Sequence, residues 1–167
     1  NDGSTDESKE LITEFEKLDS RIHSYDLSVT KGVGYARNFG IQKASGEYLY
    51  LLDSDDYLAS NTIEALYNHI GDSLMISGAV KTVKKKEDSI MEADRPLKEI
   101  KLRKIASHFK KISSLNHLFK MELIQNLDLK FDEEVNAYTD LSFFLPIINF
   151  IKEAPYNGNG VYFKRLR

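Results

Sequence analysis

Three aspartates fall within four consecutive residues of this sequence, directly after an apolar run. Asp53, Asp55 and Asp56 follow the segment 46–52, which has the composition of a buried strand. Carboxylates at the end of such a strand repel one another and lose hydration, so their charge requires compensation. A hard divalent cation such as Mg²⁺ or Mn²⁺ binds carboxylates of this kind together with the phosphates of a substrate. The spacing fits an exposed acidic turn that caps the next helix equally well, and both interpretations stay open.

Two further residues have side chains suited to chemistry. Arg37 falls on the first turns of a predicted helix, where its guanidinium can pair with a carboxylate of the sheet or with a diphosphate. Asp140 opens the last predicted helix beside an apolar segment. It is either a first-turn acid favoured by the helix dipole or a general base. Of the four histidines, His117 alone comes near this later acidic segment in sequence, and the four lack the spacing of metal ligands.

Several common chemistries are excluded by the residues present. The chain contains no cysteine, which rules out a disulfide scaffold, a thiolate zinc site and a cysteine nucleophile. The glycine-rich segment 32–37 has Arg37 where a dinucleotide-binding fingerprint needs its third glycine, and no P-loop pattern occurs. The remaining chemistry depends on oxygen, nitrogen or an added metal.

Helices and strands are predicted to alternate along the chain. The predicted helices are 4–18, 32–44, 61–70, 119–126 and 141–151, and the predicted strands are 21–25, 46–52, 74–83 and 161–164. This alternation predicts an α/β fold, layered α/β/α, with a mostly parallel central sheet. In open sheets of this kind, ligands bind beyond the carboxyl ends of the strands. The acidic residues 53–56 lie at such an end.

Two helix surfaces are predicted to pack against other elements. The first helix has a capping-box spacing, with Ser4 and Glu7 at its start. Its apolar residues recur at helical spacing and predict a buried stripe of Leu11, Phe15 and Leu18. The second helix has small residues every four positions, which predicts close approach to a sheet at Ala36, Gly40 and Ala44.

The 167 residues are enough for one domain. The net charge is only −3, but Lys and Arg outnumber Asp and Glu in the segment 81–111. This basic segment is either a solvated face or a site of attraction for an anionic acceptor or membrane surface. No motif for nucleic-acid binding is present. The longest apolar stretch, 141–151, is far shorter than the roughly 20 residues that span a bilayer.

Taken together, these segments resemble the family 2 glycosyltransferases, inverting enzymes of the GT-A fold that use nucleotide-sugar donors. Order and spacing both agree. The matching residues are Asn1-Asp2-Gly3-Ser4-Thr5-Asp6, Gly32 with Ala36-Arg37-Asn38-Phe39-Gly40-Ile41, Ala44-Ser45-Gly46-Glu47-Tyr48, Leu52-Asp53-Ser54-Asp55-Asp56, Phe131-Asp132-Glu133, Thr139-Asp140-Leu141-Ser142-Phe143 and Tyr162-Phe163-Lys164-Arg165. The resemblance implies a nucleotide- and metal-binding half at 1–80, the basic connecting segment at 81–111 and an acceptor-side half at 112–167.

The resemblance also implies a role for each matching polar residue. Asp2 would recognise the base of the donor, which is expected to be a UDP-sugar, and Arg37 would contact the nucleotide or its phosphates. Asp53 would hold the ribose or the ion, and Asp55 would be the ligand for Mn²⁺ or Mg²⁺ in the Asp-x-Asp motif. Asp140 would be the general base. Arg165 would steady the diphosphate.

The implied product is a cell-surface glycan. The acceptor is expected to be a glycan or a lipid-linked molecule, and the enzyme is expected to act in the cytoplasm, at the inner face of the membrane. The sequence departs from the family pattern in three respects: the opening strand of the family is absent, Thr139 replaces a glutamate and Thr30 replaces an asparagine. The first departure suggests a piece of a longer chain. Two alternatives stay open, a nucleotidyltransferase that releases pyrophosphate and a non-catalytic module that binds a partner through 81–111.

Overall fold

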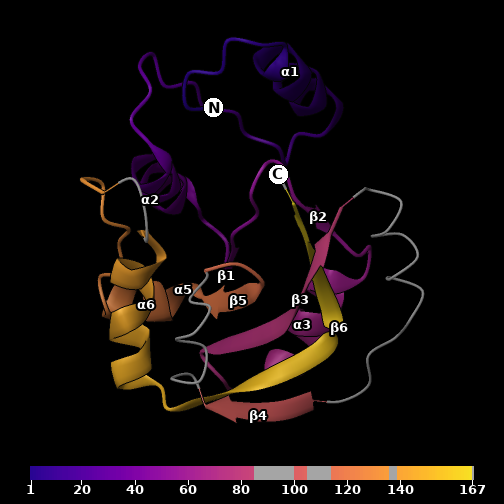
Figure 1. Cartoon of the computed structure of the whole chain (residues 1–167), viewed down its shortest axis with the longest axis vertical. Helices are drawn as coiled ribbons and strands as arrows, with labels where there is room; N and C mark the ends of the chain where they lie inside the picture. Colours follow the sequence, from indigo (N-terminus) through magenta and orange to yellow (C-terminus); the bar gives the residue numbers. More distant parts are fainter. Residues whose placement is uncertain (85–99, 105–113, 136–138, 167) are drawn as a thin grey trace. The chain divides into compact units, whose positions relative to one another are not determined.

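The computed structural model describes residues 1–84, 100–104, 114–135 and 139–166 (Figure 1). Its residues form two compact units. Unit 1 joins Asn1–Ala44 to Lys130–Thr139, and unit 2 joins Ser45–Leu129 to Asp140–Arg167. The division of the chain at 80 and 111 stays a prediction, and the basic segment 81–111 lies mostly outside the described residues.

Unit 2 is built on a six-stranded sheet of order β1-β5-β3-β6-β2, with β4 paired to β6 (Figure 1). The strands are β1 (Tyr48–Tyr50), β2 (Tyr57–Leu58), β3 (Met75–Val83), β4 (Ile100–Lys104), β5 (His117–Lys120) and β6 (Glu153–Arg165). The predicted strands at 46–52, 74–83 and 161–164 are confirmed as β1, β3 and part of β6. The sequence pattern missed β2 and β4. It also missed β5, whose last two residues were predicted as the start of the helix 119–126.

The α/β class is confirmed, but the prediction of a mostly parallel sheet is wrong. Among the described strands, β3 and β6 pair in parallel, whereas β1–β5, β3–β5, β2–β6 and β4–β6 are antiparallel. The alternation of helices and strands fixes the order of elements along the chain but not which strands become neighbours. Here β1 pairs with β5 instead of with the next strand in sequence, so no helical crossover sets its direction.

Helices cover both faces of this sheet, which confirms the layered α/β/α arrangement. On one face, Leu66 and Ile70 of α3 (Thr62–Ile70) pack against Ile76 and Leu118. On the other face, α6 (Thr139–Phe150) contributes aromatic rings that lie against the neighbouring side chains of β5; the ring contacts are His117 with Phe144, Phe119 with Phe143 and Phe119 with Phe144. Because successive side chains of a strand point to opposite faces, β5 contacts the helices of both layers. The short helix α5 (Met121–Asn126) follows β5 directly.

Strands β3, β5 and β6 meet closely at Gly78. The pairing of β3 with β6 shifts register between Gly78 and Ala79. Asn116, a fully buried residue with φ of 58°, donates hydrogen bonds to the carbonyls of Ala79 and Gly160 and accepts one from the Tyr50 hydroxyl at 2.9 Å. A Cβ atom on Gly78 would overlap both the Gly160 carbonyl oxygen and the Asn116 amide. The backbone approach therefore requires glycine at this position.

Replacing Gly78 by alanine is expected to lower the free energy of unfolding by about 1–3 kcal/mol, because the added methyl group forces backbone atoms apart. Gly40→Ala is the control: nothing lies within 4 Å of a Cβ at that exposed helical position. Alanine there is expected to leave stability unchanged or to raise it by up to about 1 kcal/mol. Urea unfolding of both variants measures the difference. A Gly78→Ala variant as stable as the parent would contradict the close approach.

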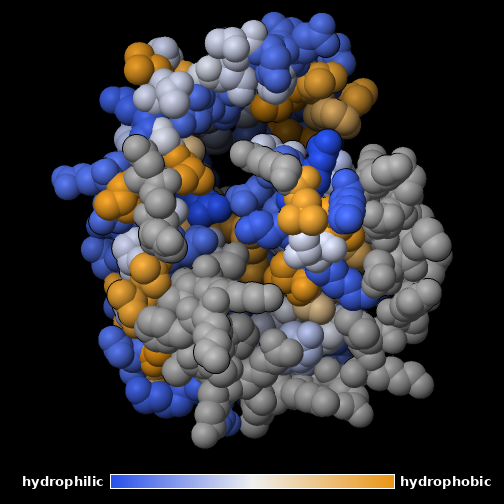
Figure 2. Space-filling model, in the orientation of Figure 1, coloured by the Kyte–Doolittle hydropathy of each residue, from blue (hydrophilic) through white to orange (hydrophobic). Residues whose placement is uncertain are grey.

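Unit 1 contains α1 (Ser8–Leu18) and α2 (Val33–Lys43). The prediction of a buried stripe on α1 is wrong: Leu11, Phe15 and Leu18 are 52%, 58% and 81% exposed. Figure 2 shows hydrophobic groups at the surface over this helix. Helical spacing identifies an apolar side of a helix but does not supply an element to cover it.

The start of α1 and the segment after it also differ from the prediction. The helix begins at Ser8, whose N–H donates to the Asp6 carboxylate at 3.1 Å, so the predicted pair of Ser4 and Glu7 does not cap it. Residues 21–25 form no strand. This segment is held instead by the Glu16 carboxylate, which accepts hydrogen bonds from both the backbone N–H and the hydroxyl of Ser24. A side-chain contact thus replaces the backbone ladder that a strand would need.

Candidate active site

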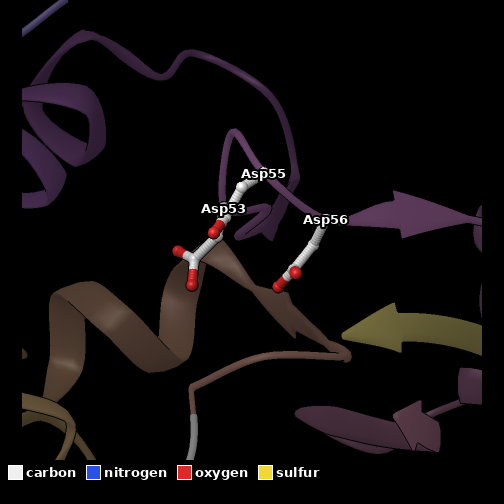
Figure 3. Close-up of side chains that lie close together, drawn as sticks. All are labelled: Asp53, Asp55 and Asp56. Atoms are coloured by element: carbon white, nitrogen blue, oxygen red, sulfur yellow. The ribbon is translucent and has the colours of Figure 1, made fainter. Parts of the chain in front are cut away.

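The three aspartates lie together in the turn between β1 and β2 (Figure 3). One carboxylate oxygen from each of Asp53, Asp55 and Asp56 lies within 4.8 Å of the other two. The backbone N–H of Asp56 donates to the Asp53 carbonyl at 3.1 Å, which closes the turn. Asp53 and Asp55 are half-buried and Asp56 is buried. The sequence thus predicted the cluster correctly, and its donor set, oxygen alone, suits a hard cation.

Asp56 is bound on both of its carboxylate oxygens by the end of β6. The Tyr162 hydroxyl donates to Oδ2 at 2.6 Å, and the Arg165 backbone N–H donates to Oδ1 at 2.8 Å. The Tyr162 oxygen also accepts the Asp53 backbone N–H at 3.2 Å. Burial, reinforced by the hydrogen bond to Asp56, raises the pKa of the Tyr162 hydroxyl well above its usual range. That hydroxyl therefore keeps its proton and remains a donor to Asp56.

Asp140 occupies the first turn of α6, as predicted, and is half-buried. The hydroxyl of the fully buried Ser114 donates to its Oδ1 at 2.5 Å. One turn further along α6, Phe144 contacts the His117 ring, and Nδ1 of His117 lies 2.9 Å from the Ser77 hydroxyl. His117 is therefore part of the packed core, whereas Asp140 has a carboxylate positioned by a neighbouring hydroxyl.

Asp2 belongs to unit 1 and lies against the segment that leads into α2. Its two carboxylate oxygens accept the backbone N–H groups of Lys31 at 2.7 Å and Gly32 at 2.8 Å. Gly32 has a φ of 94°, a conformation that favours glycine and that turns its N–H toward this carboxylate. The Thr30 hydroxyl also donates to the Asp2 carbonyl at 3.1 Å. Asp2 therefore holds the start of α2 in addition to any contact it makes with a ligand.

Arg37 and its neighbour Asn38 join α2 to the segment 130–135 within unit 1. The Arg37 guanidinium lies 5.0 Å from the centre of the Phe131 ring. The Asn38 side chain accepts the Phe131 N–H at 2.8 Å and donates to the Phe131 carbonyl at 2.9 Å. A Cβ on Gly34 would overlap the Asp132 carbonyl, so α2 makes its close approach at Gly34 and not at the predicted face that includes Gly40.

The structure brings some of the predicted site residues together and leaves others in separate units. Asp53 and Asp55 lie in one acidic cluster with Asp56, to which the Arg165 backbone is hydrogen-bonded, and the Arg165 side chain is exposed. Asp140 belongs to the same unit, whereas Asp2 and Arg37 belong to unit 1. Sequence reasoning assigned no role to three residues that position this set, Asn38, Ser114 and Tyr162, and it treated Asp56 only as a member of the acidic cluster. Asn38, Asp56 and Tyr162 lie inside the segments that match the family, whereas no sequence pattern points to Ser114.

The sequence model of glycosyl transferase family 2 matches residues 1–128. Because this match covers most of the chain, the protein belongs to that family, and the resemblance read from the motifs is confirmed.

Two relatives illustrate the relationship. The chain is 30% identical over 156 residues to teichoic acid poly(glycerol phosphate) polymerase of Staphylococcus epidermidis, an alignment covering 92% of this chain and 22% of that protein. It is 27% identical over 177 residues to uncharacterized glycosyltransferase EpsJ of Bacillus subtilis, covering 99% of this chain and 51% of that protein. The chain thus spans between about a fifth and a half of these relatives.

Crystal structures of S. aureus TarS share the fold. One matches with a TM-score of 0.80 at 19% identity, over 99% of this chain and 30% of that chain. The fragment TarS 1–349 matches with a TM-score of 0.75 at 20% identity, over 98% of this chain and 49% of that chain. The same fragment in complex with UDP or with UDP-GlcNAc matches with TM-scores of 0.74 and 0.73. The expected GT-A type of α/β fold is therefore confirmed. Among the described residues, the helices lack the length and the hydropathy that a membrane span requires.

Proposed function

We propose that this protein is a metal-dependent, inverting glycosyltransferase that transfers a sugar from a UDP-sugar to a hydroxyl group of a glycan or lipid-linked acceptor. The observation that carries the proposal is the acidic cluster after β1, with carboxylate oxygens of three aspartates within 4.8 Å of one another. Membership of glycosyl transferase family 2 supports the reaction class. The complexes of TarS with UDP and UDP-GlcNAc support a UDP-sugar as donor.

Asp53 and Asp55 would hold Mn²⁺ or Mg²⁺. Both are half-buried carboxylates on a closed turn, and oxygen ligands of this kind suit either ion. When bound, such an ion neutralises negative charge on the departing diphosphate. The exposed guanidinium of Arg165 would pair with the same diphosphate, since the Arg165 backbone is attached to the acidic turn.

Asp140 would act as the general base. Its carboxylate removes the proton of the acceptor hydroxyl while that oxygen attacks the anomeric carbon from the face opposite the diphosphate. The new glycosidic bond forms as the bond from carbon to the phosphate oxygen breaks, and the electron pair leaves with the nucleoside diphosphate. Asp2 would contact the base of the nucleotide and Arg37 the nucleotide or its phosphates. Within unit 1, the Asp2 carboxylate is held by the backbone N–H groups of residues 31 and 32, and the Arg37 guanidinium lies against the Phe131 ring.

The acceptor would belong to a cell-surface polysaccharide. The relative named as a teichoic acid poly(glycerol phosphate) polymerase supports an anionic polymer or its lipid-linked precursor as the acceptor. Synthesis from a nucleotide-sugar would place the reaction in the cytoplasm, at the inner face of the membrane. The basic segment 81–111 would then attract the anionic acceptor or the lipid surface.

Thermal unfolding with a panel of nucleotide-sugars, with and without Mn²⁺, tests the proposal. At least one UDP-sugar is expected to raise the unfolding temperature, and to do so more strongly with Mn²⁺, because a ligand that binds the native state stabilises it. Product analysis with that donor is expected to find UDP. Release of pyrophosphate would indicate a nucleotidyltransferase instead, and the absence of any nucleotide-dependent shift would favour a non-catalytic binding module.

A further inference from the structure

We infer that Tyr162 and Asp56 are positioning residues that hold the metal-binding turn in place, and that Asp56 is an anchor and not a ligand of the metal. The inference rests on the proposed function, because it concerns the geometry of Asp53 and Asp55 toward the ion. It assigns a positioning function to two residues that take no part in the proposed reaction. We name this group the β6 anchor; it comprises Asp56, Tyr162 and the backbone N–H groups of Asp53 and Arg165.

The β6 anchor connects the acidic turn to the sheet through side chains as well as through strand pairing. Two residues of β2 pair with β6, Tyr57 with Phe163 and Leu58 with Tyr162. A two-residue strand is a weak attachment for a turn that must resist repulsion between carboxylates. The Tyr162 hydroxyl adds a bridge across the turn, since it donates to Asp56 Oδ2 and accepts the Asp53 N–H. It therefore holds the backbone of the first aspartate of the cluster and the side chain of the last.

Asp56 differs from the other two aspartates in its burial. Each Asp56 oxygen accepts a hydrogen bond, from Tyr162 and from the Arg165 backbone, and the side chain is only 9% exposed. The two donors occupy one lone pair on each oxygen, and the burial of Asp56 restricts the access of a cation to the lone pairs that remain. Asp53 and Asp55 are more exposed than Asp56. The Asp56 carboxylate therefore attaches the turn to β6, and the two half-buried carboxylates of Asp53 and Asp55 provide the ligands for the ion.

The anchor has a second consequence for the donor phosphates. It attaches the Arg165 backbone to Asp56 at 2.8 Å, and Asp56 stands next to Asp55 in the chain. The cationic side chain proposed for the diphosphate and the carboxylates proposed for the ion therefore share one attachment point. A movement of β6 would displace both partners of the diphosphate together.

The affinity for Mn²⁺ in the presence of UDP, measured by titration calorimetry well below the unfolding temperature, tests the inference with Tyr162→Phe. Loss of the hydroxyl is expected to weaken Mn²⁺ binding about tenfold or more, the usual effect of removing an outer partner of metal ligands. The matched control is Tyr50→Phe, which removes the hydroxyl of another tyrosine in unit 2, one bonded to Asn116 at 2.9 Å. This control is expected to lower the unfolding temperature but to leave the Mn²⁺ affinity within about twofold of the parent protein.

A second pair of variants keeps the inference testable if Tyr162→Phe does not fold. Asp56→Asn retains an oxygen for the Arg165 N–H and an amide that can donate to the Tyr162 oxygen, so Mn²⁺ binding is expected to weaken only about threefold. Asp55→Asn removes a charged ligand and is expected to weaken binding far more.

Three outcomes would count against the inference or its basis. Unchanged Mn²⁺ affinity in Tyr162→Phe, or losses of equal size in Asp56→Asn and Asp55→Asn, would overturn the inference alone. Failure of the parent protein to bind Mn²⁺ with UDP would remove the proposed metal site, and the inference would fall with it.

Discussion

Replacing Asp140 by asparagine is expected to lower the rate of sugar transfer by about 10²–10⁴-fold, the usual contribution of a general base. Asparagine has nearly the same shape and accepts the Ser114 hydrogen bond through its carbonyl oxygen, so the start of α6 should stay intact. It cannot accept the proton of the acceptor hydroxyl. Binding of the UDP-sugar should therefore remain within about threefold of the parent protein, because the base acts on the acceptor and not on the donor. Steady-state kinetics and calorimetric titration with the donor measure the two quantities.

The control for this variant is Glu122→Gln. Glu122 is an exposed acid in the first turn of α5, and the proposed reaction gives it no role. If Asp140 only favoured the helix dipole, both substitutions would leave transfer unchanged and would alter stability by about 0.3–1 kcal/mol. Equal losses of transfer and donor binding in Asp140→Asn would also contradict the general-base role, since they would indicate damage to the donor site.

Replacing Asp55 by alanine is expected to abolish the metal-dependent part of donor binding. Asp55 is one of two half-buried carboxylates in the acidic turn, and its removal leaves Asp53 as the remaining half-buried carboxylate there. Loss of an outer partner alone costs about 10–100-fold in metal affinity, so loss of a ligand should cost at least as much. The fold should survive, because the β6 anchor contains Asp56 and not the Asp55 side chain. Titration of UDP with and without Mn²⁺ measures the metal-dependent difference.

Asp72→Ala controls for the change of charge. Asp72 is an exposed acid of unit 2 that follows α3, so its removal changes the net charge by the same amount at a distance from the acidic turn in sequence. The control should keep the full effect of Mn²⁺ on UDP affinity. If Asp55→Ala also kept that effect, the proposed metal ligand would be wrong.

The motifs of this sequence were informative because they combine local structure with carboxylates placed directly beside apolar segments. An apolar run followed by Asp53, Asp55 and Asp56 predicted both a strand and a carboxylate cluster, and both are present as β1 and the turn after it. The position of Asp140 in the first turn of α6 was predicted for the same reason. The contacts that position these residues were not predicted. The Tyr162 hydroxyl reaches Asp56 across 106 positions of sequence, and no local pattern encodes such a pairing.

Burial was the least predictable property. The stripe of Leu11, Phe15 and Leu18 has ideal helical spacing, yet all three side chains are exposed. Periodicity describes one helix at a time, whereas burial depends on a partner element. The opposite case is Asn116, a polar residue without any sequence signal, which is fully buried because three strands supply its hydrogen-bond partners.

Residue types and short-range spacing were enough to predict the family, the α/β class and the carboxylate cluster, because these depend on residues close together in the chain. Only the folded chain shows the directions of the strands, the exposure of α1 and the burial of Asp56 beside two less buried aspartates. Asp56 became an anchor only because β6 places a buried hydroxyl and a backbone N–H against its two oxygens. Strand pairing and burial arise from contacts between residues far apart in the chain, and such contacts exist only after folding.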